Sequence, residues 1–208
     1  NKGISAFILE KGTPGFGAGT PYKKLGLHAS NTAELILDNV RVPERQLCGT
    51  LHQGFVNCMQ VLEGGRIAMA AMAVGIAQGA LDQALRYMKQ RSAFGKTLAE
   101  FNGLQGMVAD MGTEIEAARL LTLRAALLKD AGKPAKLAAS MAKVFASEVA
   151  MRAATKSLQI HGGAGYITEF PIERIFRDAK LTEIGEGTSE VQRMVIAREI
   201  LGVQCRAN

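Results

Sequence analysis

The feature that most constrains this chain is a long region, beyond about residue 52, in which Ala, Met, Leu, Gln and charged residues predominate. These residues lose little side-chain freedom in a helix. Between 102 and 130 the apolar residues recur at three- and four-residue intervals, which places them on one face of a helix. We expect three long helices: the first begins at Gly54 or Arg66 and ends at Gln90, the second covers 102–130, and the third ends at His161. Helices of this length predict a bundle.

Two shorter helical segments are expected after the third helix. Pro171 suits the first turn of one of them, and the last helix starts near Ser189. Ser189 and Gln192 have the spacing of a capping box, in which each side chain satisfies a backbone N–H at a helix start. The segment 184–187 is therefore expected just before a helix N-terminus.

The first fifty residues have a different character, because turn-forming Gly and Pro residues separate short runs with β-branched and aromatic residues. These runs predict strands. The clearest extends from Thr32 to Val42, where apolar and polar positions alternate before Pro43 stops the strand. Another strand-like run, 3–10, follows directly on Asn1, so we expect the chain to begin within a longer protein.

The formal net charge of +6 suits anionic small molecules and nucleic acid alike. The basic residues are dispersed, however, and aromatic residues make up only 5% of the chain, so nucleic-acid binding is not expected. No uninterrupted apolar run approaches about 18 residues, so no membrane span is predicted.

Cys48, Cys58 and Cys205 are odd in number and lack CxxC spacing. We therefore expect neither a disulfide framework nor a structural zinc site. We expect the protein to reside in a reducing compartment. The three histidines show no metal-ligand spacing among themselves, so no metal is implied.

Glu186 lies between two glycines, which lets its backbone approach a ligand closely. That setting suits a catalytic base. It also suits an ordinary acidic residue near a helix N-terminus, which the helix dipole stabilises. On spacing alone, the second interpretation is the stronger one.

Two other segments carry residues suited to ligand contact, each with a structural alternative. Arg91, in the segment 91–98, is able to grip a phosphate, and it also suits the end of a helix. The glycine-rich segment 159–166 is able to lie against a planar or phosphate-bearing ligand, and a simple chain reversal explains its glycines equally well.

These motifs occur in a specific order along the chain. Gly-Gly-Arg at 64–66 is followed by Arg-Ser-Ala-Phe-Gly-Lys at 91–96, His-Gly-Gly-Ala-Gly-Tyr at 161–166 and Ile-Gly-Glu-Gly-Thr-Ser-Glu at 184–190. The pattern resembles the acyl-CoA dehydrogenase family over essentially all 208 residues, and is most similar to its short-chain, butyryl-type bacterial members.

The resemblance implies a mainly α fold, with a C-terminal four-helix up-and-down bundle preceded by a partial antiparallel β domain. Residues 1–50 would form the C-terminal half of the family's middle β domain and residues 51–208 its helical-bundle domain. The N-terminal helical domain and the first part of the β domain are not in this chain.

The implied activity is FAD-dependent α,β-dehydrogenation of an acyl-CoA thioester to the trans-2-enoyl-CoA. Glu186 would remove the α-proton while a hydride passes from Cβ to the flavin N5. Electron-transferring flavoprotein would accept the electrons, and the enzyme would be a homo-oligomer, expected to be a tetramer, in the bacterial cytoplasm or the mitochondrial matrix. The alternatives are an acyl-CoA oxidase-like flavoenzyme and a non-catalytic helical scaffold of the same fold.

Site residues are carried over at matching positions. Those implied to contact FAD are Arg91, Phe94, Asn102, Gln159, Ile160, His161, Gly162, Gly163, Thr188, Ser189 and Glu190. Those implied to lie near the acyl-CoA are Glu63, Arg66, Gly187 and, more weakly, Arg198. The resemblance further implies that Arg91 and 159–163 contact FAD across a subunit boundary.

Three positions depart from patterns common in the family. Some members place the base immediately before the arginine that corresponds to Arg66, where this chain has Gly65, so Glu186 is the one candidate. Many members have Tyr where this chain has Gly185, which leaves one wall of the acyl pocket open or lets another side chain fill it. Members often carry Gln where this chain has the shorter Asn102.

Overall fold

The computed structural model describes residues 3–203, so Asn1 and Cys205, which entered the sequence predictions, lie outside the described residues. The chain divides into two compact units, with the boundary between Leu62 and Glu63, inside the first helix. The assignment of residues 1–50 to a separate β domain stays a prediction.

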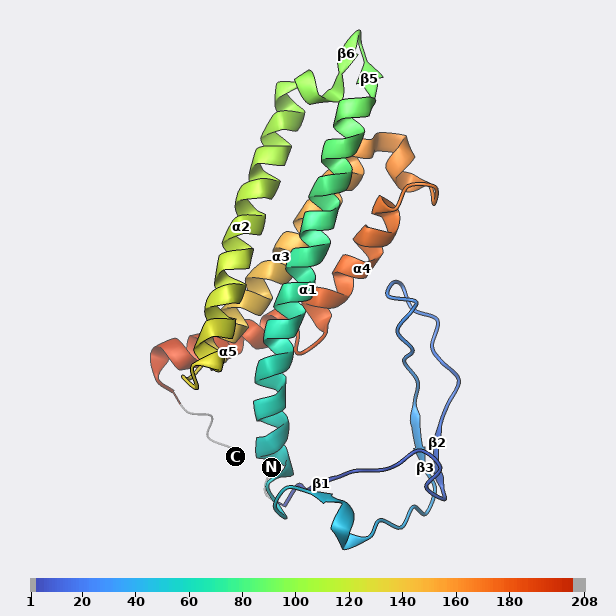
Figure 1. Cartoon of the computed structure of the whole chain (residues 1–208), viewed down its shortest axis with the longest axis vertical. Helices are drawn as coiled ribbons and strands as arrows, with labels where there is room; N and C mark the ends of the chain where they lie inside the picture. Colours follow the sequence, from blue (N-terminus) through green and yellow to red (C-terminus); the bar gives the residue numbers. More distant parts are fainter. Residues whose placement is uncertain (1–2, 204–208) are drawn as a thin grey trace. The chain divides into compact units, whose positions relative to one another are not determined.

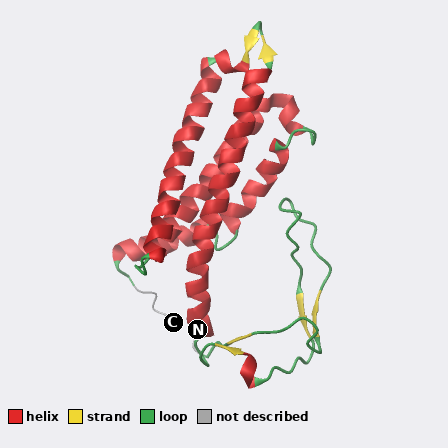
Figure 2. Ribbon diagram, in the orientation of Figure 1, coloured by secondary structure: helices red, strands yellow, loops and turns green. Residues whose placement is uncertain are grey.

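The first unit contains short antiparallel strand pairs, drawn in yellow in Figure 2. Strand β1 (Ala6–Phe7) pairs with β4 (Leu47–Cys48), and β2 (Phe16–Ala18) pairs with β3 (Leu35–Leu37). A short 3-10 helix, η1 (Glu44–Gln46), precedes β4.

The long strand predicted over Thr32 to Val42 is wrong in extent, because the strand itself is only Leu35–Leu37. Single backbone hydrogen bonds continue the pairing on either side, as from Gly19 N–H to the Glu34 carbonyl at 2.9 Å. After the strand, Asn39 adopts a left-handed φ of 48°, which turns the chain away from the ladder. All three residues of β3 are exposed. The alternating pattern thus finds no core within this unit.

The second unit consists of helices that alternate in direction, as Figure 1 shows for α1 to α4. The prediction of three long helices is confirmed, and Gly64 and Gly65 do not interrupt the first. The helices are α1 (Gly54–Gln90), α2 (Asn102–Asp130), α3 (Lys136–His161), α4 (Ile172–Ile184) and α5 (Ser189–Leu201). The connections contain β5 (Ser92–Ala93), β6 (Lys96–Thr97), η2 (Leu98–Glu100) and η3 (Gly162–Tyr166). This is the predicted up-and-down bundle.

Alanine lines much of the bundle core, where α1, α2 and α3 meet. Ala77 on α1, Ala118 on α2 and Ala146 on α3 are completely buried, as are many of their neighbours at helical spacing. Larger side chains such as Met111 and Ile115 of α2 fill the remaining space. Small side chains let the helix backbones approach closely, and Ser157 of α3 accordingly donates its hydroxyl to the backbone carbonyl of Ala80 of α1 at 2.7 Å.

Helix α1 also has the length and composition of a membrane span, and 39% of its most apolar window is buried. The mean hydropathy of this window is high because α1 is rich in Gly, Ala and Met. The sequence criterion was different, since it required an uninterrupted apolar run. The core helix of a bundle has the same properties, and the alanines of α1 do face the core. The absence of a membrane span therefore stays a prediction.

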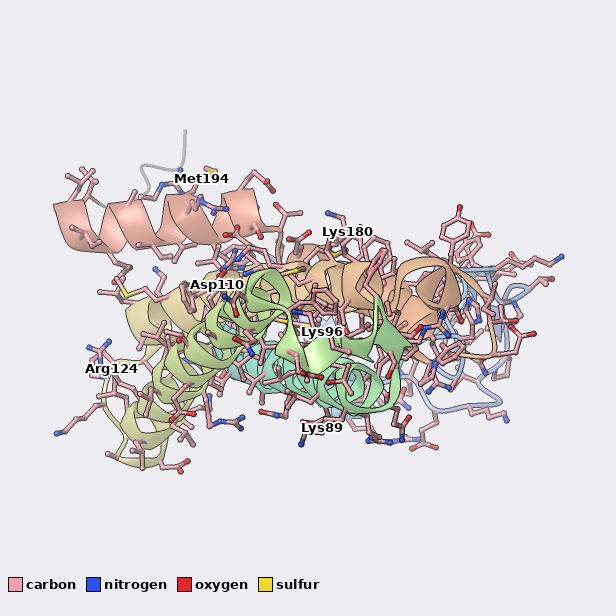
Figure 3. All side chains as sticks on the ribbon, turned by 90° about the horizontal axis from the view of Figure 1, so that it is seen from above. Lys89, Lys96, Asp110, Arg124, Lys180 and Met194 are labelled. Atoms are coloured by element: carbon pink, nitrogen blue, oxygen red, sulfur yellow. The ribbon has the colours of Figure 1, made fainter. Side chains whose placement is uncertain are left out.

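Helix α5 lies across the bundle rather than along it, in both Figure 1 and Figure 3, where it carries Met194. The predicted capping box of Ser189 and Gln192 is wrong. Thr188 is the N-cap, and its hydroxyl accepts a hydrogen bond from the backbone N–H of Val191. Ser189 is thus already inside the helix, and the Gln192 side chain turns back toward the preceding loop.

Candidate active site

The loop between α4 and α5 consists of residues 185–188 and has unusual backbone geometry. Glu186 has a φ of 57°, in the left-handed region that a residue with a Cβ seldom adopts, and Gly187 follows with a φ of 91°. Left-handed conformations at non-glycine residues gather at functional sites, because surrounding contacts have to hold them in place. The half-buried Glu186 is such a residue.

The Glu186 carboxylate lies against the backbone of α1. A Cβ built on Gly65 would be 2.3 Å from Glu186 Oε2 and 2.7 Å from Cδ, so no side chain fits there while the carboxylate keeps its place. The two positions at which the sequence comparison looked for a base are therefore in direct contact. An acidic residue at either position would present its carboxylate to nearly the same space.

Arg66 follows Gly65 and is 8% exposed. One guanidinium nitrogen, Nη1, lies 3.5 Å from Ser140 Oγ, while Nε has no hydrogen-bond partner within the part of the chain that the structure describes. A buried donor without a partner is a candidate ligand contact. Glu63, one turn earlier on α1, is partly buried.

Two buried side chains hold the Glu186 loop by its carbonyl groups. Lys143, on α3, donates to the carbonyl oxygens of Glu183 at 3.1 Å and Gly187 at 2.8 Å. Gln192 donates through Nε2 to the carbonyl oxygens of Glu186 and Gly187, both at 3.0 Å. Both side chains have no exposed surface.

Sequence reasoning missed Lys143. A signal was present, since a lysine at position 143 shares a helical face with Ala139, Ala146 and Ala150, all completely buried. Burial lowers the pKa of Lys143, and the nearby carboxylates of Glu183 and Glu190 oppose that effect.

Met69 of α1 fills the space beside Gly185. A Cβ built on Gly185 would be 2.9 Å from Met69 Cε. Met69 therefore occupies the space into which a side chain at position 185 would begin to extend.

Thr188, Ser189 and Glu190 form the first turn of α5 beside a cavity of about 170 Å³. Ser189 is 7% exposed, and its hydroxyl has no hydrogen-bond partner among residues 3–203. A hydrogen bond with the Thr188 side chain lowers the pKa of Glu190. Arg198 lies nine residues beyond Ser189, or about 14 Å along α5, and is exposed, so it is not brought next to Glu186.

Arg91, Phe94 and Asn102 lie at the other end of the bundle, where a hairpin of β5 and β6 joins α1 to α2 (Figure 1). Phe94 is 96% exposed and has a φ of 52°, and Gly95 completes the two-residue turn with a φ of 80°. Such turns favour Asn-Gly, so an exposed Phe is unusual there. Phe94 and Asn102 line a cavity of about 540 Å³, and Arg91 is exposed.

The segment 159–163 ends α3 at the same end of the bundle, as the stacking of His161 on Tyr87 of α1 shows (ring centroids 4.3 Å apart). Ile160 and His161 are buried, whereas Gln159, Gly162 and Gly163 are exposed. Burial lowers the pKa of His161, against the opposing effect of its Nδ1 contact with the Ser157 carbonyl at 2.7 Å. A ligand at this surface would meet the exposed residues and the backbone.

The candidate residues thus form two groups at opposite ends of α4, a helix about 20 Å long. Comparison with known proteins assigns both groups to one family. Residues 52–201 match the family described as acyl-CoA dehydrogenase, C-terminal domain. The chain belongs to the acyl-CoA dehydrogenase family.

Individual members of this family align with nearly the whole of this chain. The short-chain specific acyl-CoA dehydrogenase of Clostridium acetobutylicum is 51% identical over 199 residues, which cover 96% of this chain and 52% of that protein. Butyryl-CoA dehydrogenase from Megasphaera elsdenii matches in structure with a TM-score of 0.95 at 50% identity, over 96% of this chain and 52% of that one.

A chain in the structure described as the electron transferring flavoprotein of Acidaminococcus fermentans matches with a TM-score of 0.94 at 52% identity. The match covers 95% of this chain and 52% of that one. This chain therefore spans about half the length of the curated relatives it matches.

Proposed function

We propose that the protein containing this chain is an FAD-dependent acyl-CoA dehydrogenase in which Glu186 removes the α-proton of the substrate. The observation that carries the proposal is the Glu186 carboxylate, presented from a left-handed backbone against Gly65 of α1. A carboxylate fixed in this way is suited to accept a proton from a substrate lying alongside α1.

The α-C–H of a thioester is a weak acid, so a base alone is insufficient. Hydrogen-bond donors have to stabilise the negative charge that develops on the thioester oxygen. In the family one such donor is the backbone N–H of the base, which here belongs to Glu186. Met69 and Gly185 would border the acyl chain, and Arg66 would lie close to the thioester end.

The residues near α5 fit FAD as the cofactor. The Ser189 hydroxyl is buried without a partner in the described chain and faces a small cavity, as expected of a group reserved for a ligand. Thr188, Ser189 and Glu190 would hold the cofactor beside Glu186. When bound, FAD would accept the hydride that leaves Cβ as the α-proton is removed.

The second group, at the hairpin of β5 and β6, supports a flavin site completed by a neighbouring subunit. Arg91 and Phe94 are exposed at the end of the bundle remote from Glu186, where they are available to another copy of the chain. We therefore extend the proposal to a homo-oligomer, expected to be a tetramer. The matched chain of the A. fermentans flavoprotein structure supports electron-transferring flavoprotein as the electron acceptor.

The test is the substitution Glu186→Gln in the full-length protein, assayed under anaerobic conditions with butyryl-CoA by bleaching of the flavin absorbance. Loss of the base predicts bleaching that is slower by about a hundredfold to ten-thousandfold, while flavin content is retained. Glu199→Gln is the matched control, because Glu199 lies on α5, the helix that follows the Glu186 loop, and pairs with Lys136 at the surface at 2.8 Å. Bleaching near the parental rate in Glu186→Gln would refute the assignment of the base. Rapid reoxidation of the reduced parental protein by air would instead point to an oxidase.

A further inference from the structure

The Glu186 loop requires external support. Four residues, 185–188, join α4 to α5, and Glu186 adopts a conformation that an L-residue leaves readily when nothing holds it. Rotation of φ to negative values would move the carboxylate away from Gly65. The contacts that prevent this rotation therefore determine where the base stands.

Lys143 lies on α3 and contacts the backbone on both sides of Glu186. Its ammonium group contacts the carbonyl of Glu183, before Glu186, and the carbonyl of Gly187, after it. It reaches them from α3, the helix that also packs against α4 and α5. One side chain thereby fixes both ends of the turn relative to the bundle.

Packing alone does not explain a lysine at this position. A buried ammonium loses its hydration, and an apolar side chain of similar volume usually serves a core as well or better. The buried lysine is retained among alanines, and its hydrogen bonds go to the loop carbonyls. The Glu183 and Glu190 side chains offset part of the burial of the charge, while Arg66 adds to it.

Gln192 supplies the second point of attachment. Its Nε2 lies 3.0 Å from each of the carbonyl oxygens of Glu186 and Gly187. Gly187 has room for this contact only because it lacks a side chain, since a Cβ there would lie 2.8 Å from Gln192 Nε2. Both carbonyls next to the base are thus held by completely buried donors.

We infer that Lys143 and Gln192 are positioning residues that clamp the 185–188 loop and hold Glu186 where it removes the α-proton. The inference rests on the proposed function of Glu186 and adds two residues that do not touch the substrate. The clamp acts on the chemical step, so its loss changes kcat more than KM.

The decisive experiment replaces Lys143 by Met in the full-length holoenzyme, with Lys156→Met as the control. Lys156 lies on the same helix, and its ammonium group pairs with Asp110 of α2 at 2.9 Å instead of with the loop carbonyls. With butyryl-CoA, Lys143→Met is expected to lower kcat between tenfold and a hundredfold, with KM within threefold of the parent. The isotope effect on kcat from α-deuterated substrate is expected to rise, because proton removal becomes more fully rate-limiting.

A second readout is independent of activity. Amide hydrogen exchange in a peptide covering 183–188 is expected to be at least tenfold faster in Lys143→Met and unchanged in Lys156→Met. If Lys143→Met does not fold, Gln192→Met carries the same expectations.

Three outcomes would overturn the clamp: kcat within threefold of the parent, an isotope effect that stays at the parental value while kcat falls, or unchanged exchange at 183–188. The second outcome is that of a smaller active fraction, which a purely structural role produces. Activity retained in Glu186→Gln would refute the proposed function itself, whereas loss in Glu186→Gln with retention in Lys143→Met refutes the clamp alone.

Discussion

At the scale of single residues, the contact between Gly65 and Glu186 has the clearest consequences. A side chain at position 65 would compete with the carboxylate for space, although the carboxylate is the free end of a flexible side chain and is able to move. A small side chain at position 65 should therefore leave the protein folded but impair removal of the α-proton by Glu186.

We expect Gly65→Ala to lower kcat about tenfold, since displacement of a base by roughly 1 Å impairs its alignment with the α-proton. Replacing a helical glycine should at the same time leave thermal stability unchanged or raise it, by up to about 1 kcal/mol. Gly75→Ala on the same helix is the control, because a Cβ at Gly75 meets nothing within 4 Å. Steady-state kinetics and thermal unfolding measure the two effects, and equal kcat in both variants would contradict the prediction.

A second residue-scale prediction concerns the size of the acyl group. Met69→Ala would open the space that Met69 Cε occupies beside Gly185. Longer acyl chains should benefit, by at most about fourfold in kcat/KM for each additional buried methylene group, at about 0.8 kcal/mol each. The measurement is the ratio of kcat/KM for hexanoyl-CoA to that for butyryl-CoA. An unchanged ratio would place Met69 outside the acyl pocket.

At the scale of elements, the helices were predictable in extent, whereas the predicted strand runs 3–10 and 32–42 contain β1 and β3 but exceed them in length. The long helices α1, α2 and α3 follow from their helix-favouring composition and, for α2, from apolar residues at three- and four-residue intervals. Both signals lie within one continuous segment of sequence. Strand β3 has only β2 to pair with in its unit, so its alternating pattern over-predicts the paired length. The prediction of Ser189 as the N-cap of α5 was wrong because Thr and Ser are both favoured at N-cap positions, so sequence alone does not separate Thr188 from Ser189.

The candidate site was predictable only in part, for a related reason. Glu186 is singled out by the ordered set of motifs along the chain, whereas its own spacing favours an ordinary acidic residue near a helix N-terminus. Lys143 is 43 positions away, and its role depends on α3 passing behind the loop, which no local pattern encodes. The contact of Met69 with Gly185 likewise depends on how two helices meet.

A pH prediction belongs to the end of α3. Burial lowers the pKa of His161 from its ordinary value of 6.5, so acidification protonates the unfolded chain while the folded one stays neutral. The unfolded state then binds more protons, and His161 subtracts from stability as the pH falls below about 6.5.

His161→Phe keeps a ring against Tyr87 and removes this titration. We expect its melting temperature to fall less than that of the parent between pH 7.5 and pH 5.5. Differential scanning calorimetry at the two pH values measures the difference. The same decrease in both proteins would contradict a neutral, buried imidazole.

At the scale of the whole molecule, the question is whether one chain or two form each flavin site. The groups around Glu186 and around Arg91 lie at opposite ends of α4. A site shared between subunits makes a specific prediction for mixtures of defective chains.

Arg91→Ala and Glu186→Gln should each be inactive or nearly so in the full-length protein. Co-expressed with different affinity tags and purified as hybrids, they should recover up to about half of the parental activity per dimer. One of the two sites then combines an intact Glu186 with an intact Arg91 from the other subunit. Activity no greater than that of the two variants alone would show that each chain forms its own site.

The alanine-lined core limits how this chain is able to vary over time. An alanine side chain is a single methyl group, so nearly every substitution at these buried positions introduces a larger side chain. Extra methylene groups in a tightly packed core are destabilising by about 1 to 3 kcal/mol. We therefore expect the spacing between helix axes to tolerate little change. Solvent-facing and ligand-facing positions are left as the places where new specificities arise.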